Sequence, residues 1–230
     1  MIANARAEEL EWFGNRIIQN ELWDATAETL LMVGWASLAT VLIGLPIGMA
    51  LVATRQGGIR PNRIINFILS LIVNVGRSIP FIILLIILLP VTDWVMRTNI
   101  GWRGMAFPLA IGSIPFFARL VETNLLAIDS GKVEASQMMG ASRTRVMGDV
   151  LLREALPGII QSISVLVIMI IGFSAMGGTV GGGGLGALAY NYGYQRYHLD
   201  VLTITVVVLV IIVQLVQVLG DMLSRYVDHR

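Results

Sequence analysis

Long, almost uncharged apolar stretches alternate with short polar segments along the chain. A helix needs roughly 20 mostly apolar residues to cross the hydrocarbon core of a bilayer. Five stretches are predicted to be membrane-spanning helices, at about 30–53, 64–92, 105–128, 156–180 and 201–220. β-branched runs such as Thr203–Val210 do not indicate strands, because a helix satisfies its own backbone groups in lipid and an open strand does not. The pattern therefore predicts an all-α integral membrane protein with five transmembrane helices.

The second stretch, 64–92, is longer than a span requires and contains Arg77 and Pro80. It could be one long tilted helix, or two short segments broken at Arg77–Pro80. Neither half alone reaches the length that a bilayer requires. We therefore expect one span.

The remaining segments divide the chain into three parts. Residues 1–29 are rich in Asp and Glu and lack the basic start and short apolar stretch of a signal peptide. They are expected to form an extracytoplasmic or interfacial segment. Residues 30–222 are the predicted transmembrane domain, with one long loop at 129–155, and residues 223–230 are a short tail.

Basic residues predict the orientation, because cytoplasmic loops carry an excess of Lys and Arg. With the 54–63 loop inside, the larger basic group is cytoplasmic: Arg55, Arg60, Arg63, Lys132, Arg143, Arg145, Arg153, Arg225 and Arg230. The smaller group is then outside: Arg6, Arg16, Arg97, Arg103 and Arg196. This arrangement predicts an N-terminus outside the inner (cytoplasmic) membrane of the cell and a C-terminus in the cytoplasm.

Composition agrees with a membrane protein and limits its chemistry. The chain of 230 residues is 56% hydrophobic and 13% charged, against about 25% charged in an average soluble domain. Its formal net charge of +1 gives no reason to expect nucleic-acid binding. It has no cysteine, and His198 and His229 lie far apart, so disulfides and a metal site are not expected. The sequence predicts no cofactor and no catalytic residue in this chain.

The long loop has the pattern of two helices joined by a corner. Asp129 or Ser130 can cap a short helix, and Gly140 can end it in a left-handed conformation. Ser142 can cap a second helix, which is expected to stop before Pro157. The second helix places an apolar face on one side: Val146, Val150 and Leu151.

The first of these two helices carries Glu134 beside an apolar patch of Val133, Met138 and Met139. Such a patch on a helix that faces water is typical of a surface that docks into a partner's groove. Glu134, Ala135 and Ser136, followed after three residues by Gly140, resemble the EAA loop of type I ABC importer permeases. Arg153 stands where that pattern usually has proline. The resemblance implies a coupling helix that sits in a cleft of a cytoplasmic ATPase, with these coupling residues: Glu134, Ala135, Ser136, Met138, Met139 and Gly140.

Three further segments are similar to the methionine-importer branch of that family: 74–85, 172–186 and 192–197. The resemblance implies a type I importer permease fold and a homodimer. It also implies two cytoplasmic ABC ATPase subunits and an extracytoplasmic methionine-binding protein. The expected substrate is D- and L-methionine, with another amino acid as the alternative.

Residues 177–186 form a glycine run after the fourth stretch. Gly181, Gly183 and Gly186 match G-x-G-x-x-G, but a nucleotide site would need a strand before them. The P-loop motif G-x-x-x-x-G-K-[ST] does not occur in the sequence, so ATP hydrolysis is expected from a partner. Two interpretations stay open: the glycines end the span and turn the chain, or they let helices approach closely across a dimer axis and let a gate move.

Met176 is a large, flexible residue within a run of small ones: Ser174, Ala175, Gly177 and Gly178. A methionine side chain can plug a narrow passage. Together with the resemblance, this pattern gives the hypothesis that Met176 from two protomers narrows the translocation path, with Ser174, Gly177 and Gly178 beside it.

Arg77 is a charge within an apolar stretch, which is costly in a bilayer and usually faces the protein interior or water. Two roles stay open: it bonds to carbonyls or to nearby Asn74 and Ser78, or it faces the substrate route. Arg119 and Glu122, three residues apart, are expected to pair on one helix face.

The leading hypothesis is a permease that works by alternating access. A secondary transporter is the first alternative, but such proteins usually carry acidic residues within their spans and often inverted repeats, and the sequence offers neither. A membrane-embedded enzyme would need convergent catalytic groups, for which the sequence has no candidates.

Overall fold

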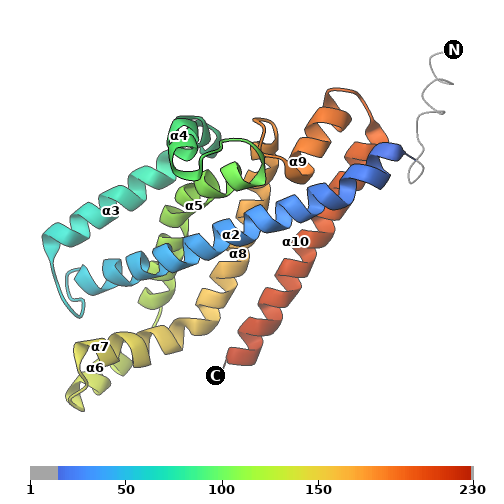
Figure 1. The fold of residues 1–230 in the computed structure, drawn as a ribbon. Coiled ribbons are helices and arrows are strands. Elements are labelled where there is room, and N and C mark those ends of the chain that lie inside the picture. The colour runs from blue at the N-terminus through green and yellow to red at the C-terminus, as the bar shows by residue number, and fades with distance from the viewer. Residues whose placement is uncertain (1–14, 229–230) are drawn as a thin grey trace. The chain divides into compact units, whose positions relative to one another are not determined.

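The computed structural model describes residues 15–228. In that part, the chain forms helices joined by turns and contains no β-strand (Figure 1). The elements are α2 (Arg16–Thr54), α3 (Arg63–Ser78), α4 (Phe81–Met96), α5 (Gly101–Leu126), α6 (Ser130–Met138), α7 (Arg143–Arg145), the π-helix η1 (Val146–Leu152), α8 (Arg153–Gly178), α9 (Gly184–Leu188), the π-helix η2 (Ala189–Tyr194) and α10 (Leu199–Val227). The first part of the expected N-terminal segment and the end of the expected tail lie outside the described residues.

The apolar helices match the predicted spans in number and approximate place. By length and composition, four helical stretches of the described chain could cross a membrane: Arg16–Thr54, Gly101–Leu126, Arg143–Gly178 and Leu199–Val227. The pair α3 and α4 makes a fifth if it crosses as one broken span.

The segment 64–92 forms the broken alternative, not one long helix. Helix α3 ends at Ser78, Ile79 has an extended backbone with φ −84° and ψ 124°, and α4 begins at Phe81. The cause is Pro80, because a proline ring disfavours the helical conformation of the preceding residue and removes a backbone donor. The break therefore falls within the segment that the sequence offered as the alternative.

Helix α2 is longer than expected. It begins at Arg16 rather than near residue 30, so the acidic residues 16–29 continue into the apolar helix without a break. Asn15 caps it, since its side-chain oxygen accepts from the backbone N–H of Ile17 at 2.9 Å. Helix α10 likewise continues past residue 220 to Val227 and takes up most of the expected tail.

The described chain forms two compact units, and α2, α5, α8 and α10 each contribute residues to both. We call them the loop unit (37–80, 111–166 and 217–228) and the turn unit (15–36, 81–110 and 167–216). Each has its own apolar core.

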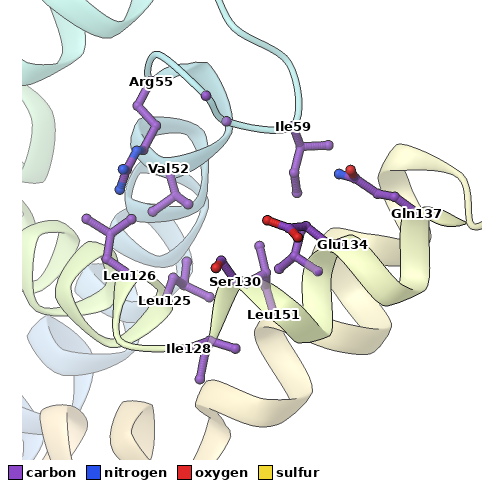
Figure 2. A pocket seen from close by; sticks show the side chains of 13 residues that line it. Val52, Arg55, Ile59, Leu125, Leu126, Ile128, Ser130, Glu134, Gln137 and Leu151 are labelled. Carbon is purple, nitrogen blue, oxygen red and sulfur yellow. The ribbon is translucent and has the colours of Figure 1, made fainter.

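In the loop unit, α2, α3 and α5 pack around Leu51, Val73 and Ala118. Two glycines four residues apart, Gly44 and Gly48, bring α2 close to α5. A Cβ atom added at Gly48 would lie 2.6 Å from the Cβ atom of Val121 and 2.7 Å from the carbonyl oxygen of Ala118. The loop that follows α2 lies beside α6 and η1 in the same unit (Figure 2).

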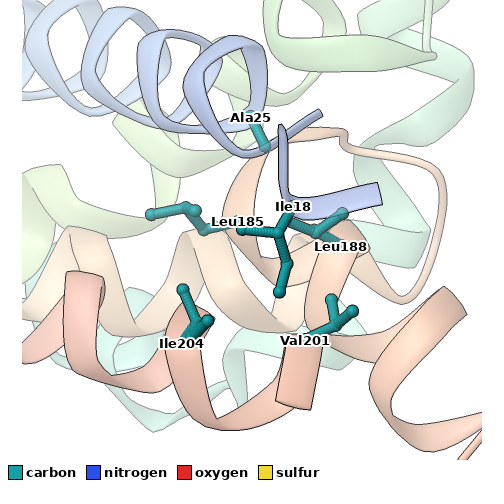
Figure 3. Close-up of a cluster of buried hydrophobic side chains, with 6 residues drawn as sticks. All are labelled: Ile18, Ala25, Leu185, Leu188, Val201 and Ile204. Carbon is teal, nitrogen blue, oxygen red and sulfur yellow. The ribbon is translucent and has the colours of Figure 1, made fainter. Parts of the chain in front are cut away.

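In the turn unit, the core joins three segments that are far apart in the sequence (Figure 3). Ile18 and Ala25 come from the acidic first half of α2. Their partners come from α9 and α10: Leu185, Leu188, Val201 and Ile204. The first half of α2 therefore has one apolar face that is buried within the protein, and its exposed residues include polar ones such as Gln19, Asn20 and Asp24.

The close contact at Gly48 predicts a strong dependence of stability on this residue. Gly48→Ala should lower the thermal unfolding midpoint of the detergent-purified protein, because the added methyl group meets backbone on α5 and such overpacking costs about 1–3 kcal/mol. Gly34→Ala is the matched control, since Gly34 lies in the same helix with no neighbouring atom within 4 Å of an added Cβ. It should keep or raise the midpoint. Equal midpoints for the two variants would contradict the packing account.

Candidate functional site

The long loop forms the two helices and the glycine corner that the sequence predicts. Asp129 caps α6, because its Oδ1 atom accepts from the backbone N–H of Gly131 at 2.7 Å. After α6, Gly140 has φ +82° and donates its N–H to the carbonyl of Gln137 at 2.9 Å. This left-handed turn reverses the chain after α6.

The second helix begins as expected but does not stop where expected. Ser142 caps it by accepting from the N–H of Arg145 at 3.4 Å. From there α7, η1 and α8 follow as one helical stretch, Arg143–Gly178, with Pro157 inside α8. The predicted stop before Pro157 is therefore wrong. A proline removes one donor, and the wider π-helical turns just before it show where the regular hydrogen-bond pattern shifts.

The predicted coupling residues lie on a helix that is attached on one side and free on the other. Ser136 is buried, whereas Met138 and Met139 are 90% and 82% exposed. The remaining three are exposed as well: Glu134, Ala135 and Gly140. The Glu134 carboxylate makes no hydrogen bond or ion pair with any other residue among 15–228, so it is available to an outside partner.

The attached side of α6 borders a cavity of about 340 Å³ in the loop unit (Figure 2). Arg55 and Ile59 reach it from the end of α2 and the following loop, Leu125 from α5, Glu134 from α6 and Leu151 from η1. Apolar side chains line the cavity together with four polar or charged ones: Arg55, Ser130, Glu134 and Gln137. Around the cavity, the residues after α2 lie next to α6.

One ion pair also holds α6 to the start of α8. The Nζ atom of Lys132 lies 2.5 Å from Oε2 of Glu154. Both side chains are partly exposed, so the pair contributes little to stability by itself. It shows that α6 lies beside the helical stretch that follows the corner.

The predicted gate residues lie in the last turns of α8, in the turn unit. Ser174 is buried and donates to the carbonyl of Ile171 at 2.7 Å, while Met176 is 42% exposed. Gly177 and Gly178 are buried. Met176 is therefore a large exposed side chain next to small buried residues. Its role as a gate stays a prediction.

The glycine run after α8 makes a tight turn and a close approach within the same chain. Gly181, Gly183 and Gly184 have φ values of +89°, +71° and +70°, which favour glycine. A Cβ atom at Gly178 would collide with the backbone of Gly186 at the start of α9. The turn is therefore present, and the close approach occurs within one chain; approach across a dimer axis and movement of a gate stay predictions.

The first turn of α9 is capped by side chains of α2, which the sequence analysis missed. Oε2 of Glu28 accepts from the N–H of Gly184, and Oγ1 of Thr29 accepts from the N–H of Leu185, both at 2.8 Å. A signal was present in the sequence. Ile18, Ala25 and Thr29 recur at helical spacing, which marks a buried face within the acidic segment.

Tyr192, in η2, adds a second link between α2 and the segment that follows α8. Its hydroxyl donates to Oε1 of Glu21 at 2.7 Å, and this hydrogen bond, followed by burial, raises the pKa of Tyr192 above its usual value near 10. Arg196 lies over the same ring, at 4.6 Å from its centroid. The acidic face of α2 is thus occupied by contacts within the turn unit.

Arg77 does not make the bonds offered as its first role. Asn74 accepts from Arg119 at 2.6 Å, and Ser78 donates to the carbonyl of Asn74 at 2.8 Å. Arg77 itself is exposed in the last turn of α3 and bonds to no other residue in the described part of the chain. The predicted Arg119–Glu122 pair is confirmed, at 2.5 Å.

Among residues 15–228, no group of three or more His, Cys, Asp or Glu side chains could hold a metal ion. The structure places α6 and the polar end of α3 in the loop unit, and the glycine-rich turn in the turn unit.

A comparison with known families now identifies the chain. Residues 43–230 match the family of binding-protein-dependent transport system inner membrane components. The chain belongs to this family. Members are membrane components of transport systems, so the chain is a multi-pass membrane protein and its predicted fold class is confirmed.

Close relatives within the family cover nearly the whole chain. It is 43% identical over 220 residues to the probable D-methionine transport system permease protein MetI of Vibrio cholerae, which covers 96% of this chain and 97% of that protein. It is 41% identical over 210 residues to the methionine import system permease protein MetP of Bacillus subtilis, which covers 91% and 95%.

Solved structures give the same result for the fold. An inward-facing MetNI methionine ABC transporter matches with a TM-score of 0.91 and 42% identity, over 94% of this chain and 100% of that one. A solved amino acid ABC transporter matches with a TM-score of 0.74 at 20% identity. The fold is therefore shared with proteins that are only distantly similar in sequence.

The cap on α9 predicts the effect of one hydroxyl group. Thr29→Val should lower the free energy of unfolding by about 1–3 kcal/mol, because the buried N–H of Leu185 would lose its acceptor. Thr26→Val is the matched control, since the Thr26 hydroxyl donates to Leu22 within its own helix. Thermal unfolding of the purified variants checks this. A midpoint for Thr29→Val as high as that of Thr26→Val would argue against the cap.

Proposed function

We propose that this chain is the transmembrane permease subunit of an ATP-driven importer that carries D- and L-methionine across the cytoplasmic membrane. The observation that supports this most strongly is the match to the MetNI methionine transporter, at 42% identity over the full length of that chain. Two relatives whose names specify methionine transport support the same substrate. A permease of the same class for another amino acid is the alternative.

The proposed assembly is a homodimer of this chain with two cytoplasmic ABC ATPase subunits and an extracytoplasmic methionine-binding protein. The partner ATPase hydrolyses ATP, and this chain uses no cofactor. The exposed methionines and unpaired carboxylate of α6 support docking into an ATPase groove. In the proposed orientation, the N-terminus is outside and the loop that contains α6 faces the cytoplasm, as the distribution of basic residues predicts.

The proposed mechanism is alternating access. ATP closes the ATPase subunits, α6 moves with them, and the translocation path changes between an outward and an inward opening. Nucleotide and binding protein shift this equilibrium, because each binds one of the two states more tightly. Met176, with Ser174, Gly177 and Gly178 beside it, narrows the path.

Uptake into proteoliposomes tests the proposal. Vesicles containing this chain, its ATPase and the binding protein should accumulate labelled methionine when ATP is inside the same compartment as the ATPase. Unlabelled methionine should compete and leucine should not. Accumulation driven by a membrane potential without ATP would replace the importer with a secondary transporter. ATP-dependent uptake of a different amino acid would keep the permease and change the substrate.

The corner after α6 predicts how coupling fails. Gly140→Val should weaken co-purification of the ATPase and lower ATP-dependent uptake, because a β-branched residue at φ +82° costs about 1–3 kcal/mol of strain and shifts α6. Gly148→Val is the control, since Gly148 lies in η1 with open space around an added Cβ. Full ATPase yield and full uptake in the Gly140→Val complex would disprove the role of this corner.

A further inference from the structure

One face of α3 carries polar side chains along its whole length. The face consists of residues that recur every three or four positions: Asn66, Ser70, Asn74, Arg77 and Ser78. The opposite face is apolar and exposed, with Ile68, Ile72 and Val75 among its residues. In a membrane, an amphipathic helix turns its apolar face to lipid and its polar face to protein or water.

The polar face changes character along the helix. At the first turn it packs within the loop unit, where the amide of Asn66 donates to the carbonyl of Leu51 at 2.8 Å and to Oγ1 of Thr54 at 3.2 Å. At the last turn its residues are exposed, including Asn74 and Arg77. The open end of this face therefore lies about 20 Å from Arg63, at 1.5 Å of rise per residue.

The charge at this open end is not neutralised within the described chain. Glu122, the acid nearest to it in the hydrogen-bonded network, is paired with Arg119 at 2.5 Å, and Arg119 also occupies the side-chain oxygen of Asn74. Arg77 bonds to none of the described residues. A guanidinium group stays charged at any accessible pH, so it requires water or an anion.

The backbone next to Arg77 points to the same environment. Helix α3 ends at Ser78, Ile79 is extended and Pro80 has no N–H, so the last carbonyls of α3 lack helical donors. Irregular backbone at membrane depth is tolerated where it is covered by protein or lines a water-filled cavity. Ser78 and Pro80 are exposed, so no described residue covers them; lipid has no donors for the free carbonyls, and water does.

We propose that Arg77 faces the aqueous translocation route and receives the carboxylate of the amino acid in transit. This assignment rests on the proposed function and adds a substrate-binding residue to it. The planar guanidinium matches a carboxylate with two parallel hydrogen bonds. A carboxylate that leaves water for a narrow passage loses solvation, and a fixed cation on the wall offsets that loss.

The absence of cysteine from the sequence allows a direct test of accessibility. Arg77→Cys, in a complex with cysteine-free partners, should react with a charged, water-soluble methanethiosulfonate reagent. Saturating methionine with binding protein and ATP should slow the reaction severalfold. Val75→Cys is the matched control, because Val75 is 51% exposed on the opposite face of α3 and should not react. An unreactive Arg77→Cys, or one that reacts equally with and without methionine, overturns the proposal. If the reaction is equally fast with and without methionine, the anion next to Arg77 would instead be a lipid phosphate.

Transport measurements then test the charge. Arg77→Gln should lower the maximal uptake rate at least about tenfold, as expected for loss of a charge-assisted hydrogen bond, with an unchanged apparent KM because the binding protein captures the substrate. Arg77→Lys should retain part of the rate. Arg77→Cys should recover uptake after modification with an aminoethyl reagent and should stay inactive after modification with a sulfonatoethyl reagent.

The outcomes separate the two proposals. A wild-type complex that transports methionine with an equally fast Arg77→Gln variant overturns the role of Arg77 and leaves the proposed function intact. Recovery with either reagent, irrespective of charge, also overturns it, because a structural role would depend on size alone. A wild-type complex that assembles but takes up no methionine overturns the proposed function, and the carboxylate assignment with it.

Discussion

Every helix end in a membrane protein leaves backbone donors or acceptors without a partner, and lipid supplies none. At the starts of three helices in this chain, a side chain accepts from the free N–H groups; it comes from another segment or from the residue just before the helix. Glu28 and Thr29 accept from the first N–H groups of α9, Asn62 accepts from those of α3, and Asp129 from α6. The first two connect residues separated by 156 positions in the sequence. The cap on α9 thus fixes the acidic first half of α2 against the turn after α8.

Where no side chain caps a helix end, the surroundings of the protein must supply the missing hydrogen-bond partners. The end of α3 has an extended residue, a proline and an unpaired arginine close together. Neither an apolar chain nor a bound side chain covers these groups in the described part of the chain. At the start of α9, side chains of the protein itself meet the backbone's need for partners. At the end of α3, the same need points to water, and the arginine points to an anionic group that passes through that water.

The features that sequence reasoning predicted are those whose causes are local. Apolar length marks the spans, and φ > 0 at Gly140 follows from a glycine between two capped segments. Other features depended on partners far away in the chain. No local pattern tells that Glu28 meets Gly184, or that Asn74 would bond to Arg119 and leave Arg77 free. The break at Pro80 had a local signal, but the length required for a membrane span outweighed it in the prediction. At Pro157 the same kind of signal misled, because the helical stretch continues through this proline after a π-helix.

The end of the long loop and the predicted gate residues lie on one helical stretch, which has a mechanical consequence. Arg143–Gly178 begins directly after the Gly140 corner, and its last turns carry Met176. Since α6 packs against η1, a displacement of α6 by a partner would be applied to the base of that stretch. A helix resists bending far more than a loop does, apart from its π-helical turns at Val146–Leu152. These turns are the place where the stretch could absorb or redirect such a displacement, and they lie beside the cavity that borders α6.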